Sequence, residues 1–130
     1  MNNEELRMNN LRIMRENVVR DKSFDFAVRI VNLYKHLSQE KKEFVLSKQL
    51  LRSGTSVGAN IEEAIGGISK ADFMAKLSTA YKEARETTYW IRLLHTTEYL
   101  TNKEFESIFN DADELCKLLF SIIKSTNKQL

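Results

Sequence analysis

Apolar residues recur every three or four positions over most of the chain, which is the spacing of one face of an α-helix. Four segments follow this pattern, and they predict helices over residues 24–37, 42–65, 70–97 and 102–124. Strand signals are weak, since the sequence has no proline and only four glycines. Each predicted helix has one apolar stripe to bury. The pattern therefore favours an all-α fold, an up-and-down antiparallel four-helix bundle.

Three of the predicted helix starts carry N-cap signals. Ser23, Ser69 and Thr101 each precede a helical pattern, and their hydroxyl oxygens suit the free N–H groups of a first helical turn. Ser69 and Thr101 also have an acidic residue three positions on, Asp72 and Glu104, which gives a capping-box signal.

Small residues interrupt the second predicted helix in the run GTSVGAN. Gly54 and Gly58 fall on its apolar side, together with Val57 and Ile61. Glycine inside a helix costs about 1 kcal/mol relative to alanine, so this placement needs a reason. We expect another helix to approach closely here. The run is no phosphate-binding loop, because the Gly-Lys-Ser/Thr ending of that motif is missing.

Composition indicates one folded domain. The chain has 130 residues, of which 42% are hydrophobic and 29% charged, and its net charge is +2. We divide it into a weakly helical N-terminal arm at 1–22, a bundle domain at 23–125 and a C-terminal tail at 126–130. No apolar run approaches the roughly 20 residues of a membrane span, and no secretory signal is recognisable. We expect a cytoplasmic protein with no membrane partner.

Catalytic and metal-binding signals are weak. Cys116 is the only cysteine, which excludes an intrachain disulfide, and its apolar neighbours indicate a buried thiol. His36 and His95 lie on different predicted helices without a metal-binding motif around them. No nucleophile, base and orienting group come together. We therefore expect no metal, no cofactor and no enzymatic activity, and an enzyme with an unrecognised site is the least favoured alternative.

Two runs in the middle of the chain look familiar. They are QLLRSGTSVGANIEEA at 49–64 and SKADFMAKLSTAYKEARETTYWIRLL at 69–94. Both strongly resemble the bacterial four-helix bundle family also called intervening-sequence or S23-type proteins. The resemblance implies an antiparallel bundle that assembles into a homopentameric ring. It also implies kinship with accessory proteins of diversity-generating retroelements, which are associated with a reverse transcriptase and with nucleic acid. It implies no catalytic activity.

One face of the second predicted helix carries a polar stripe: Gln49, Arg52, Ser56, Asn60 and Glu63. The third helix offers a complementary set: Glu83, Glu86 and Trp90. Arg52 can pair with either acid, within one chain or between subunits. We favour packing or a subunit interface for both sets over plain solvent exposure or a ligand site. For Trp90, core packing and an interface anchor both stay open.

A basic cluster lies on another face of the third helix: Lys82, Arg85, Tyr89 and Arg92. The cations can neutralise phosphates and the tyrosine can stack on a base, so this is the candidate nucleic-acid site. The alternative is a solvated face on which Glu86 compensates Lys82. We expect a non-enzymatic, oligomeric protein that binds RNA or DNA or acts as an accessory protein. The main alternative is a scaffold that recruits a partner such as a reverse transcriptase.

Overall fold

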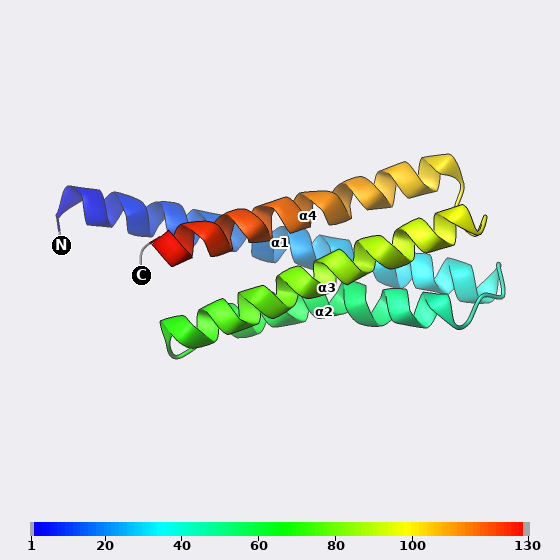
Figure 1. Cartoon of the computed structure of the whole chain (residues 1–130), viewed down its shortest axis with the longest axis horizontal. Helices are drawn as coiled ribbons and strands as arrows, with labels where there is room; N and C mark the ends of the chain where they lie inside the picture. The colour runs from blue at the N-terminus through cyan, green and yellow to red at the C-terminus, as the bar shows by residue number, and fades with distance from the viewer. Residues whose placement is uncertain (1, 129–130) are drawn as a thin grey trace.

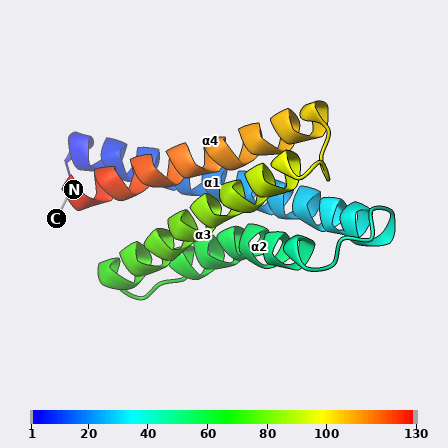
Figure 2. The same cartoon turned by 45° about the vertical axis from the view of Figure 1, so that its right-hand side comes forward.

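Four long helices make up the computed structural model, which describes residues 2–128. They are α1 (Asn3–Gln39), α2 (Leu46–Ile65), α3 (Lys70–Thr96) and α4 (Asn102–Lys128). Successive helices run in opposite directions, and α1 and α3 each pack against both α2 and α4 (Figures 1 and 2). The described residues contain no strand. The predicted all-α, four-helix architecture is confirmed.

One apolar stripe from each helix fills the centre of the bundle. Its fully buried members include Ile30 of α1, Ile61 of α2, Ile91 of α3 and Leu119 of α4. Cys116 is buried beside them as expected, and burial raises the pKa of its thiol.

Among the described residues, every buried side-chain nitrogen and oxygen atom has a hydrogen-bond partner. No described helix has the length and apolar character needed to cross a bilayer.

The first helix begins twenty-one residues before the predicted start, so the expected N-cap at Ser23 is wrong. Ser23 lies inside α1, is 1% exposed and donates a hydrogen bond to the carbonyl oxygen of Arg20. The N-cap is Asn2, whose side chain accepts from the N–H of Glu5 at 2.8 Å. Glu5 returns a bond from its carboxylate to the Asn2 N–H. Residues 3–22, expected to be a weakly helical arm, are therefore the first half of α1.

The last helix also exceeds its predicted end, because the longer α1 gives it a surface to pack on. Thr126, placed in the expected tail, is only 4% exposed. The preceding residue, Ser125, accepts a hydrogen bond of 3.0 Å from Arg15 of α1. The α4 helix continues to Lys128, and residues 129–130 of the expected tail lie outside the described residues.

Glu43 determines where α2 begins. Lys42 before it has a left-handed backbone, with φ of 56°, which interrupts the helix predicted to start there. The buried Glu43 carboxylate then accepts from the N–H groups of Val45, Leu46 and Ser47 at 3.0, 2.9 and 2.7 Å. Burial by itself raises the pKa of Glu43, but these bonds favour the charged form and outweigh it, so the pKa lies below its ordinary value.

The N-caps predicted at Ser69 and Thr101 are confirmed. The Ser69 hydroxyl accepts from the N–H of Asp72 at 3.1 Å. Thr101 and Glu104 form the full capping box, with reciprocal bonds of 3.1 and 2.8 Å. The bond from the Thr101 N–H to its carboxylate lowers the pKa of Glu104.

The glycines of α2 face α1, as predicted from their place on the apolar side. A Cβ atom added to Gly54 would lie 2.8 Å from both Cγ atoms of Ile30. One added to Gly58 would lie 3.4 Å from the carbonyl oxygen of Ser23. Only the first distance is a clash. Gly54 therefore permits the close approach of the two helices, whereas Gly58 leaves room for a methyl group.

We predict opposite effects for two Gly→Ala substitutions. Gly54→Ala gains about 1 kcal/mol of helix propensity, but overpacking against Ile30 costs about 1–3 kcal/mol, so urea unfolding should show a net loss. Gly58→Ala is the matched control and should stabilise by up to about 1 kcal/mol. Equal stabilisation by both would contradict the close contact. In an Ile30→Ala background, the Gly54→Ala penalty should shrink.

We predict that Glu43→Gln destabilises the protein by about 1–3 kcal/mol at neutral pH, because hydrogen bonds to a charged carboxylate are lost. The folded pKa of Glu43 is depressed, so its contribution is present above the unfolded pKa and is lost as pH falls through the folded pKa. The difference between wild type and variant should therefore narrow below about pH 4. Glu106→Gln, on an exposed residue of α4, is the control and should leave stability unchanged.

Candidate nucleic-acid interface

Lys82, Arg85, Tyr89 and Arg92 lie on the outer side of α3, and the structure exposes all four. We call these four residues the basic face. Tyr89 is 53% exposed. Within the part of the chain that the structure describes, no ion pair involves any of the three cations. Their charge is therefore available to an external anion.

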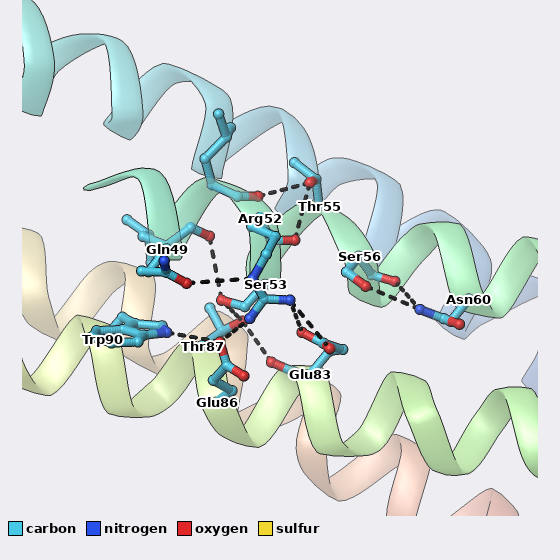
Figure 3. Close-up of polar contacts among 12 residues, drawn as sticks. Gln49, Arg52, Ser53, Thr55, Ser56, Asn60, Glu83, Glu86, Thr87 and Trp90 are labelled. Atoms are coloured by element: carbon cyan, nitrogen blue, oxygen red, sulfur yellow. Dashed lines mark hydrogen bonds and ion pairs between the residues drawn. The ribbon is translucent and has the colours of Figure 1, made fainter. Parts of the chain in front are cut away.

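Glu86, the acid expected to compensate Lys82, makes its contacts on the other side of α3. Its carboxylate pairs with Arg52 of α2 and accepts from the Trp90 indole N–H at 2.9 Å. This arrangement (Figure 3) directs the negative charge toward α2. It speaks against simple compensation of Lys82 on the solvated face.

Trp90 joins the basic face to the bundle. Its ring is partly buried and packs against the core cluster. Tyr89 meets it edge to face, with ring centroids 5.0 Å apart and an interplanar angle of 76°. Within this chain Trp90 therefore packs at the rim of the core, and its role as an interface anchor stays a prediction. The contact supports Tyr89 on one side and leaves the rest of its ring accessible.

Arg52 links α2 to α3 in the way the polar stripe suggested. It pairs with Glu83 at 3.1 Å and with Glu86, and its Nε lies 3.5 Å from the Gln49 side-chain oxygen (Figure 3). Both predicted pairings thus occur within one chain. Partial burial lowers the pKa of Arg52, but the bonds with Glu86 and Glu83 outweigh it and raise the pKa. Arg52 is positively charged at any ordinary pH.

The remaining residues of the polar stripe have local partners. Asn60 donates to the carbonyl and hydroxyl oxygens of Ser56 at 2.9 and 3.0 Å, one turn away on the same helix (Figure 3). Glu63 pairs with Lys76 of α3 at 3.2 Å. The stripe is therefore satisfied within α2 and α3.

The sequence reasoning missed two features near the basic face. Ser53 and Thr87 form a buried hydroxyl pair between α2 and α3, 2.9 Å apart (Figure 3). Phe120 of α4 is 54% exposed, and its ring lies 6.0 Å from that of Tyr81 on α3. An exposed phenylalanine at the margin of an apolar stripe gives no sequence signal that separates it from the core. It adds an aromatic surface on the side of α3 that faces α4.

The two histidines have partners at the same end of the bundle. His36 lies 2.8 Å from Glu40 and 3.8 Å from Glu104. His95 contacts Asn102 at 2.7 Å and stacks on Phe105. Among residues 2–128, no three His, Cys, Asp or Glu side chains are arranged to hold a metal ion.

Comparison with known proteins identifies relatives. A model of the family described as "23S rRNA-intervening sequence protein" matches residues 15–121. A crystal structure of a protein of unknown function from the S23 ribosomal protein family of Bacteroides thetaiotaomicron is 64% identical in sequence, with a TM-score of 0.83. The match covers 85% of this chain and 98% of that one. No curated protein matches the sequence.

We predict that Arg52→Ala lowers the free energy of unfolding by about 1 kcal/mol, since the ion pairs are half exposed to water. Urea unfolding measures this effect. Light scattering on the same variant tests the subunit-interface role, for which a lower mass is expected. An unchanged mass would confine Arg52 to packing within one chain. Lys48→Ala, on an exposed residue of the same helix, is the control for both measurements.

Proposed function

Because the chain belongs to the 23S rRNA-intervening sequence protein family, we propose that it is a non-enzymatic accessory protein that binds the backbone of RNA or DNA through the basic face. The observation that carries this proposal is a set of three exposed cations, Lys82, Arg85 and Arg92, around an exposed Tyr89. None of the three makes an ion pair with another residue of 2–128. Such cations gain free energy from phosphate by releasing condensed counterions. The proposed site of action is the cytoplasm.

The role of each residue of the basic face follows from the chemistry of its side chain. Lys82, Arg85 and Arg92 contact phosphate, and Tyr89 stacks on a base. The guanidinium groups can hold phosphate oxygens in a bidentate manner, whereas Lys82 acts as a point charge. None of these contacts reads base edges, so binding depends on charge and shape more than on sequence.

We propose further that the protein works as a homo-oligomer, and that it is a pentamer, as the sequence resemblance implies. Three cations make a weak site when they act alone. A closed ring repeats the basic face once in each subunit, so one nucleic-acid strand can contact several copies at once. This raises the apparent affinity without any new kind of contact. Light scattering on the full chain tests the subunit number.

The test is binding of labelled single-stranded RNA, duplex RNA and duplex DNA at about 50 and 200 mM salt, measured by anisotropy. We predict that Arg85→Glu weakens binding about tenfold or more and flattens the salt dependence by about one phosphate contact per engaged subunit. Lys48→Glu makes the same charge change on α2, away from the basic face, and is expected to affect binding far less. Light scattering should give both variants the wild-type mass.

Two results would overturn the proposal. One is the absence of binding to any of the three probes at about 50 mM salt, where phosphate contacts are strongest. The other is an equal loss of affinity in Arg85→Glu and Lys48→Glu, which would reflect net charge alone. Either result would favour the alternative of a scaffold that recruits a protein partner, such as a reverse transcriptase, without nucleic-acid binding.

A further inference from the structure

The first half of α1 carries its charged and apolar residues on unexpected sides. Three of its four arginines turn toward the bundle. Arg12 lies over the Phe73 ring at 5.2 Å, Arg15 donates to α4, and Arg20 pairs with Glu62 of α2 at 2.6 Å. Large apolar side chains of the same segment are exposed instead. A helix with its apolar side toward water has a surface that its own bundle does not cover.

Five exposed residues of this segment follow a regular spacing, whereas Leu6 and Ile13, which are also exposed, lie outside it. Arg7, Leu11, Met14, Val18 and Asp21 recur at intervals of four, three, four and three, and we call them the outer seam. Its apolar members Leu11, Met14 and Val18 are 45%, 62% and 44% exposed. This seven-residue repeat is the one by which two helices pack along a continuous seam.

The charges at the two ends of the seam indicate what covers it. Arg7 and Asp21 are of opposite sign and lie seven residues on either side of Met14. Neither makes an ion pair within residues 2–128. A second copy of the same seam, turned end for end, is complementary to it at every position.

We infer that the outer seam pairs antiparallel with the outer seam of a second copy of this chain, about a two-fold axis at Met14. Arg7 then lies against the partner's Asp21, and the symmetry makes this pair twice. Leu11 packs against the partner's Val18, and the two Met14 side chains meet at the axis. A parallel pairing would instead place Arg7 against the partner's Arg7.

The shape of the molecule agrees with this arrangement. The N-terminal part of α1, dark blue in Figure 1, lies at the end of the bundle where α4 finishes. Two such segments that overlap antiparallel direct their bundles away from each other, so the bundles do not collide. Glu4 and Asp25 meet at the edges of the contact, where water and salt weaken the repulsion between them.

A groove beside the seam extends the apolar surface onto α4. It has a volume of about 310 Å³, and Met8, Leu11 and Ile122 contribute its apolar lining. Side chains of the second copy that flank its seam can enter this space. The contact therefore involves more than one row of residues on a single helix.

This contact is separate from the proposed function. Arg7, Leu11 and Met14 precede the segment that the family model matches, residues 15–121, and none of them belongs to the basic face. The inference is thus a pairing of two assemblies through α1, whatever the subunit number within each. Its failure would leave the nucleic-acid proposal untouched.

Light scattering across a concentration series tests the pairing. Met14→Lys should have half the mass of the wild type, with unchanged helix content by circular dichroism. Ile68→Lys is the control, because Ile68 is 94% exposed at the turn between α2 and α3, and it should keep the wild-type mass. Arg7→Asp should also lower the mass, and Arg7→Asp combined with Asp21→Arg should restore it. A wild-type mass in Met14→Lys would overturn the inference.

Disulfide trapping tests the orientation. In a Cys116→Ser background, Met14→Cys should form disulfide-linked dimers under mild oxidation, because the two positions meet at the axis within the reach of a disulfide. Arg7→Cys should not cross-link, since its two copies lie about 21 Å apart along an antiparallel pair. Cross-linking of both variants to the same extent would indicate a parallel pair and overturn the antiparallel assignment.

Discussion

The close contact between α1 and α2 at Gly54 sets the geometry on which the rest of the bundle depends. The missing Cβ leaves space for Ile30, a fully buried residue of α1. Glycine weakens a helix by about 1 kcal/mol relative to alanine, and burial of a whole isoleucine side chain contributes about 1.5–3 kcal/mol. The packing gain thus exceeds the local loss, and α2 can lie against α1 along its small-residue side.

One side of α2 packs against α1, and the neighbouring side of α2 contacts α3 and orients it. The buried pair of Ser53 and Thr87 favours one register of the two helices, since only that register brings the two hydroxyl groups together in the core. Each hydroxyl also donates to a carbonyl oxygen of its own helix, Ser53 to Leu50 and Thr87 to Glu83. Arg52 engages Glu83 and Glu86 at the rim of the same contact. Both glutamates of α3 are thereby held toward α2. The outer side of α3 is left positively charged, although the net charge of the whole chain is only +2.

Most of this could be read from the sequence, because the determining residues act locally. Apolar periodicity identifies four helices, and Ser69 and Thr101 identify two of the starts through short-range hydrogen bonds. The role of Glu43 at the start of α2 was not predicted, for a physical reason. A carboxylate in a loop looks solvated in sequence, and only the fold shows it buried beneath three backbone N–H groups. The exposure of Phe120 was not predicted because it depends on how α4 is rotated against α3.

The first half of α1 exposes a deeper limit of periodicity. A sequence pattern reports that a helix has an apolar side, but not whether that side meets its own bundle or another molecule. Here Arg12 and Arg15 contact the bundle, whereas Leu11 and Met14 are exposed on the same helix. Apolar residues of a helix are usually expected to face the core of their own bundle. Few apolar residues of this segment do so, and the sequence therefore predicts a weak arm where the chain forms a helix. Pairing with a second copy accounts for the exposed apolar side chains, since that copy supplies the apolar surface that the single bundle lacks.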